Sequence, residues 1–169
     1  MKRAIIIFSF VLLSIIQACK INYSFTGASI PLDVKTVSVL TFPNYSALVQ
    51  PQLSQSFTES LRDKFQAQTN LQLVSRGGDL NFEGSITNYN ITPLAIQAGS
   101  DLAAQTRLTI TVNVKFTNQK NDKLNFESSF TRFADFESSK SLSTEEERLI
   151  KEINELLVQD IFNKSVVNW

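Results

Sequence analysis

The ten residues from Leu108 to Thr117 alternate without interruption between apolar and polar side chains. The apolar set is Leu108, Ile110, Val112, Val114 and Phe116, and the polar set is Thr109, Thr111, Asn113, Lys115 and Thr117. Successive side chains of a strand point to opposite faces of its sheet, so one face of this strand is buried and the other meets water. A helix cannot easily cover a row of hydroxyl, amide and ammonium groups. We therefore expect any helices to pack on the apolar face, in a two-layer fold with one open sheet face.

The same kind of periodicity predicts the other elements. Leu53, Phe57, Leu61 and Phe65 recur every fourth residue, as on the buried face of an amphipathic helix. Pro51 suits the first turn of that helix, where a missing N–H costs nothing. The predicted helices cover 51–68 and about 143–162, and the predicted strands cover 34–42, 71–75, 80–91, 108–117 and 124–136.

The second helix has a start signal in Ser143-Thr144-Glu145-Glu146. This pattern predicts a capping box, in which the Ser143 hydroxyl accepts a bond from an amide of the first turn and Glu146 reaches back to the cap. One apolar stripe then follows, formed by Leu149, Ile150, Ile153, Leu156, Leu157 and Ile161.

Two polar segments separate the later strands. Arg76-Gly77-Gly78-Asp79 has the chemistry of a turn that reverses the chain, and 118–123 is a second polar turn. We expect Phe126 and Phe130 of the last strand to face the core. The element order predicts an α+β fold: a two-layer sandwich with a mostly antiparallel or mixed sheet of about four strands and two helices on one face.

The N-terminal residues are typical of an exported lipoprotein. Lys2 and Arg3 precede an apolar run from Ala4 to Ile16, which is too short for a spanning helix but fits a secretory signal. Ile16-Gln17-Ala18-Cys19 then matches a bacterial lipobox, although Gln17 is unusual at its position. We expect a signal peptide at 1–18, a lipidated tether at 19–33 and one domain at 34–169. An ordinary cleaved signal, with Cys19 as an incidental thiol, is the alternative.

Composition excludes several classes of protein. Because Lys2 and Arg3 lie in the signal, fourteen of the sixteen basic residues remain against sixteen acidic ones, so the mature chain has a net charge near −2. It lacks the basic excess of a nucleic-acid-binding protein. The single cysteine permits no intramolecular disulfide. Histidine is absent, which removes the commonest general base and metal ligand.

An enzyme would need its catalytic groups from carboxylates. Glu83, Glu127 and Asp135 could supply a carboxylate pair. Acidic residues on the wet face of a strand are usually only solvated, and we expect no enzymatic activity, no cofactor and no metal site.

Four parts of the chain together resemble the LptE family of lipoproteins. They are Cys19, the stretch Tyr23–Gly27, the strand Leu108–Val114, and the segment from Phe130-Thr131-Arg132-Phe133 through Lys140 into Leu149–Glu152. The resemblance spans almost the whole mature chain and rests on the order of elements more than on any single motif. It implies a non-enzymatic lipoprotein of the outer membrane that faces the periplasm. Such a protein plugs the LptD β-barrel translocon, helps it to assemble and binds lipopolysaccharide.

The residues suggest where those partners would bind. Thr109, Thr111, Asn113 and Lys115 form a polar face that suits the interior of a wide outer-membrane barrel. Arg107, Arg132 and Lys140 lie near predicted strand ends and are candidates for lipopolysaccharide phosphates, which bind guanidinium groups well. The alternative for each of the three is a solvated charge or a weak surface ion pair.

Two other lipoproteins would show the same signals. A peptidoglycan-synthase activator or a secretion-pore pilot would also be exported, anchored and built around an open sheet. The protein that co-purifies with a C-terminally tagged chain would separate these alternatives.

Overall fold

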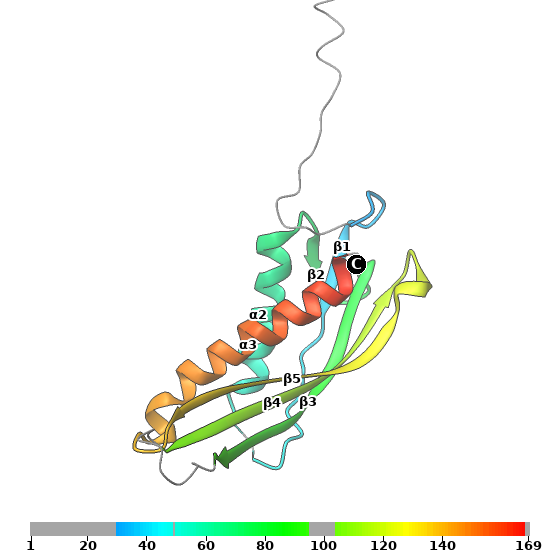
Figure 1. The fold of residues 1–169 in the computed structure, drawn as a ribbon. Coiled ribbons are helices and arrows are strands. Elements are labelled where there is room, and N and C mark those ends of the chain that lie inside the picture. The colour runs from blue at the N-terminus through cyan, green and yellow to red at the C-terminus, as the bar shows by residue number, and fades with distance from the viewer. Residues whose placement is uncertain (1–29, 49, 95–103, 168–169) are drawn as a thin grey trace, which may run out of the picture.

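The computed structural model describes residues 30–48, 50–94 and 104–167. The predicted signal peptide, Cys19 and the stretch Tyr23–Gly27 lie outside the described residues. Figure 1 shows two helices on one side of a twisted sheet. The elements in chain order are β1 (Thr36–Val39), α2 (Leu53–Gln68), β2 (Gln72–Val74), β3 (Leu80–Pro93), β4 (Gln105–Asn118), a 3-10 turn (Asp122–Leu124), β5 (Phe126–Glu137) and α3 (Leu142–Val166).

The sheet is mixed and has the strand order β2-β1-β3-β4-β5. β1 is parallel to β2 and β3, while β3, β4 and β5 are antiparallel. The predicted α+β fold class is therefore confirmed, with five strands where about four were expected. The shortest strand is β2, which lies within the predicted strand 71–75; it has only three residues and still pairs in register with β1, with Val37 opposite Leu73.

The core lies between the sheet and the two helices. The predicted stripe of α2 is buried completely, with Leu53, Phe57, Leu61 and Phe65 at 0% exposure. Phe65 lies 4.8 Å from the ring centre of Phe82 in β3 and 5.2 Å from that of Phe162 in α3. This aromatic contact joins both helices to the middle of the sheet.

The start of α3 differs from the prediction. The helix begins at Leu142, and its N-cap residue Ser141 makes no side-chain capping bond. The Ser143 hydroxyl bonds that of Ser141 at 2.6 Å. The Glu146 carboxylate accepts bonds from the Tyr89 hydroxyl at 2.5 Å and the Gln50 side-chain amide at 3.3 Å. The predicted capping box is therefore wrong, because the Glu146 carboxylate binds Tyr89 and Gln50 and does not reach back to the start of the helix.

The segment between β2 and β3 is a crossover. Both strands are parallel to β1 and lie on either side of it, so residues 75–79 must pass over β1. A Cβ atom on Gly78 would lie 2.7 Å from the Ser38 backbone nitrogen, and Gly77 has a positive φ of 68°. The predicted turn exists, but it connects parallel strands and depends on glycine for its close approach to β1.

Candidate functional site

The open face of the sheet is the candidate site. Its predicted residues Thr109, Thr111, Asn113 and Lys115 alternate with β4 side chains that are fully buried under the helices, namely Leu108, Ile110, Val112 and Val114. The structure thus places the four polar residues together, on the face opposite α2 and α3. Phe126 and Phe130 lie on the helix side, as predicted, where they are partly buried against the core.

Cross-strand bonds satisfy many polar groups of this face. The Thr111 hydroxyl bonds that of Thr131 at 2.9 Å, and the Asn113 amide donates to Glu127 at 3.0 Å. The Lys115 ammonium pairs with Glu83 at 2.7 Å, and this hydrogen bond raises the pKa of Lys115. Such exposed pairs add little stability. They do give the face a surface whose charges already have partners.

Arg107 belongs to the same face, near the start of β4. Its guanidinium donates two bonds to the Asp135 carboxylate, at 2.8 and 2.9 Å, and this pairing raises the pKa of Arg107 and lowers that of Asp135. The guanidinium carbon also lies 3.5 Å from the ring centre of Phe133, which is 47% exposed. A stacked arginine and aromatic ring is a frequent anchor in protein interfaces.

The other two basic candidates lie elsewhere. Arg132 donates two bonds to Asp160 of α3, at 2.6 and 2.8 Å, so its side chain lies on the helix side of β5. Lys140 lies in the turn before α3, with its ammonium 3.9 Å from Glu145. Arg107 and Arg132 therefore pair on opposite faces of the sheet. Asp135, which binds Arg107, is an odd number of positions from Arg132, and neighbouring positions of a strand alternate between faces.

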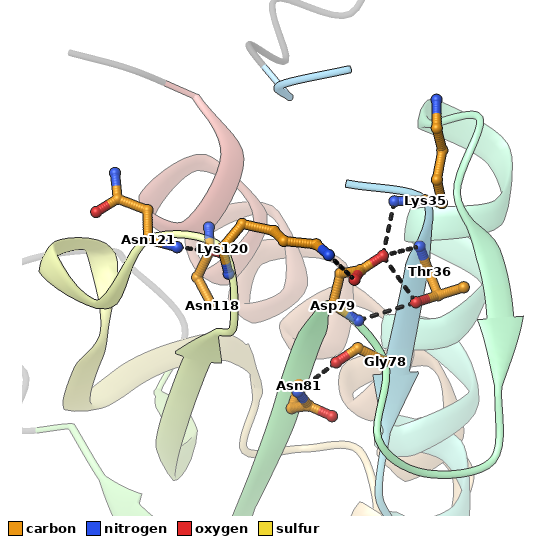
Figure 2. Close-up of polar contacts among 8 residues, drawn as sticks. All are labelled: Lys35, Thr36, Gly78, Asp79, Asn81, Asn118, Lys120 and Asn121. Carbon is orange, nitrogen blue, oxygen red and sulfur yellow. Dashed lines mark hydrogen bonds and ion pairs between the residues drawn. The ribbon is translucent and has the colours of Figure 1, made fainter. Parts of the chain in front are cut away.

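A second polar cluster surrounds Asp79 (Figure 2) and was predicted only as part of a turn. Its carboxylate accepts bonds from the backbone nitrogens of Lys35 and Thr36, at 2.8 and 3.0 Å, and pairs with the Lys120 ammonium at 3.2 Å. These contacts hold the pKa of Asp79 well below its usual range. The hydrogen bond from the Lys35 backbone has the largest effect, and the bond from the Lys120 ammonium has the next largest. Asp79 thereby joins the crossover to the start of β1 and to the β4–β5 hairpin.

The carboxylates considered for catalysis are separated by a cation. In the strand register, Lys115 lies between Glu83 and Glu127.

Within the described ranges, no three Cys, His, Asp or Glu residues gather in a group that could hold a metal ion. None of the helices in the same part of the chain is long and apolar enough to cross a membrane.

Known structures share this fold. A minor lipoprotein from Acinetobacter baumannii aligns with a TM-score of 0.51 and 14% identity, over 78% of this chain and 91% of that one. Lipoprotein B from Nitrosomonas europaea aligns with a TM-score of 0.50 and 18% identity, over 86% of this chain and 88% of that one. Rare lipoprotein B from Shewanella oneidensis aligns with a TM-score of 0.50 and 14% identity, over 76% of this chain and 92% of that one. At these identities the likeness concerns the fold alone.

Sequence comparison supplies the family. A search of curated proteins finds no match. The model of the family described as "LptE: Lipopolysaccharide-assembly" matches residues 34–165, which include every helix and strand described above apart from the last residue of α3. The chain therefore belongs to the LptE family of lipopolysaccharide-assembly proteins.

Proposed function

We propose that this protein is a lipid-anchored, periplasm-facing component of the outer membrane that plugs the LptD β-barrel translocon and helps it to assemble. Family membership supports the role in lipopolysaccharide assembly. The observation that carries the finer proposal is the open sheet face, where Lys115 and Arg107 both have carboxylate partners.

When a plug enters a barrel, its surface loses contact with water and comes into contact with the inner wall of the barrel. The interior of an outer-membrane barrel is polar, so it offers hydrogen bonds to hydroxyl and amide groups. Removing an unpaired charge from water costs a large free energy, whereas removing a charge that already has an ionic partner costs less. The ladder of Thr111, Asn113 and Lys115 with their cross-strand partners fits such a wall, and Phe133 under Arg107 gives it one apolar anchor.

A single substitution tests this interface. Thr111→Arg places an unpaired cation in the middle of the ladder, and we expect at least a tenfold loss of LptD recovered with the tagged protein, since an unpaired charge in an interface costs about 2–5 kcal/mol. Gln66→Arg adds the same charge to the exposed surface of α2 and serves as the control. Full recovery of LptD by a folded Thr111→Arg variant would place the interface elsewhere. Recovery of a peptidoglycan synthase or a secretion pore instead would select one of the alternative functions.

The proposal includes lipopolysaccharide binding by Arg107, Arg132 and Lys140. Arg107 and Lys140 lie near the same end of the sheet, and both arginines are paired with carboxylates, Arg107 with Asp135 and Arg132 with Asp160. Replacing all three residues with Glu should weaken binding of labelled lipopolysaccharide and reduce its sensitivity to salt, because pairing with phosphates is screened by ions. The measurement is equilibrium binding at two ionic strengths, with circular dichroism to confirm the fold. Unchanged affinity at both would leave these residues as surface charges.

A further inference from the structure

The open face contains a pocket of about 410 Å³ at its β1 end. Its lining includes Ser38 and Leu40 from the β1 segment, Glu83 from β3, Thr117 from β4, and Arg76 and Gly77 from the crossover. The pocket has the size of an ordinary ligand site. It lies on the same sheet face as the proposed barrel contact.

The crossover builds this pocket. Gly78 lies against the backbone of β1, close enough that a Cβ atom would come within 2.8 Å of the Val37 carbonyl carbon. Figure 2 shows Gly78 beside β1, with Asp79 bonded to Thr36, the first residue of that strand, and to Lys35 just before it. Arg76 and Gly77 therefore border a hollow over the neighbouring strands, and the bonds of Asp79 hold this arrangement.

The charges around the pocket are unequal. The Lys115 ammonium is paired with Glu83, and the Lys120 ammonium with Asp79. Arg76, by contrast, is exposed and makes no ion pair with any acidic side chain in the described part of the chain. The pocket therefore presents a guanidinium whose two-pronged donor geometry matches a carboxylate.

Two of the other polar side chains in the pocket wall, Ser38 and Asn81, are already engaged. The Ser38 hydroxyl donates to Asn81 at 2.6 Å, and the Asn81 amide donates to the Gly78 carbonyl at 2.6 Å. Leu40 adds an apolar surface that is half-buried. A side chain that ends in a carboxylate and carries methylene groups complements both Arg76 and Leu40.

We propose that this pocket receives an aspartate or glutamate side chain from the inner wall of the barrel partner, with Arg76 as its ionic partner. The identity of that partner rests on the proposed function. The contact would fix the rotational position of the plug, because the pocket lies at one end of the sheet and the Arg107–Phe133 stack lies toward the other end of the β4–β5 pair.

Charge reversal tests the contact. Arg76→Glu should reduce the LptD retained after a high-salt wash at least tenfold, while Arg76→Lys should retain most of it. Lys151→Glu makes the same change in charge on the exposed surface of α3 and should retain LptD in full. Unfolding curves of the three variants must match that of the wild type. Retention by Arg76→Glu equal to that of Lys151→Glu would overturn the assignment.

Cross-linking identifies the occupant. A photoreactive residue in place of Thr117 should cross-link to a barrel peptide that contains Asp or Glu. A cross-link to a peptide without an acidic residue, or only to lipopolysaccharide, would contradict the proposal. If the wild type recovers LptD and Thr111→Arg loses it while Arg76→Glu keeps it, only the pocket assignment fails. If the wild type recovers no barrel, the proposed function fails, and the pocket assignment fails with it.

Discussion

Gly84 occupies a position in β3 where no side chain fits. It pairs with Val114 in the middle of the β3–β4 ladder. An ideal Cβ atom on Gly84 would lie 2.0 Å from the backbone oxygen of Asn113 and 2.7 Å from Cε1 of Phe42. The Asn113 oxygen cannot move aside alone, because β4 is held between β3 and β5. Gly84→Ala must therefore separate the two strands locally and displace the Phe42 ring.

The cost follows from these two displacements. An added methyl group in a packed core destabilises a protein by about 1–3 kcal/mol. Phe42 is fully buried and meets Phe57 edge-on, with ring centres 5.1 Å apart. Losing such an aromatic pair adds about 0.5–1.5 kcal/mol. We expect Gly84→Ala to lower the free energy of unfolding, measured by urea titration, by about 2–4 kcal/mol.

Gly77→Ala is the matched control. Gly77 has a φ of 68° and has nothing within 4 Å of its would-be Cβ atom. Alanine at position 77 is disfavoured only by the left-handed backbone conformation, which costs about 1–2 kcal/mol for a residue with a Cβ atom. If Gly84→Ala proves no more destabilising than Gly77→Ala, the close approach of β3, β4 and Phe42 is wrong.

Three further changes test the core, the Asp79 cluster and the anchor. Leu61→Ala should cost about 2–5 kcal/mol in urea unfolding, while Thr111→Ala should cost little in the isolated domain; equal losses would contradict the open face. The pKa of Asp79 is lowered by folding, so its contribution to stability is present above the unfolded-state value near 4 and is lost as the pH falls toward the folded-state value. The stability difference between wild type and Asp79→Asn should accordingly be widest near pH 7 and narrow below about pH 4, and a difference that stays constant down to pH 2 would show that Asp79 is not a stabilising carboxylate. Cys19→Ala should release the protein from membranes, and a wild-type protein that takes up no labelled fatty acid would end the lipidation proposal.

Several features of the fold were predictable from local patterns. The alternation from Leu108 to Thr117 indicated which face of β4 is buried, and the four-residue spacing from Leu53 to Phe65 indicated the buried face of α2. Both inferences succeeded because side-chain direction repeats with a period that neighbouring residues set by themselves. The family resemblance used the same patterns, and the match over residues 34–165 confirms it.

Tertiary structure alone decided which distant groups meet. Glu146 satisfies the local pattern of a capping box, yet Tyr89, 57 residues away, holds its carboxylate. Arg107 and Arg132 look equivalent in the sequence, but strand register sends one to Asp135 and the other to Asp160. The Gly77-Gly78 turn likewise becomes a crossover only because β1 lies between β2 and β3. Local periodicity determines which side of an element is buried, whereas the partner of a polar group depends on packing between segments far apart in the chain.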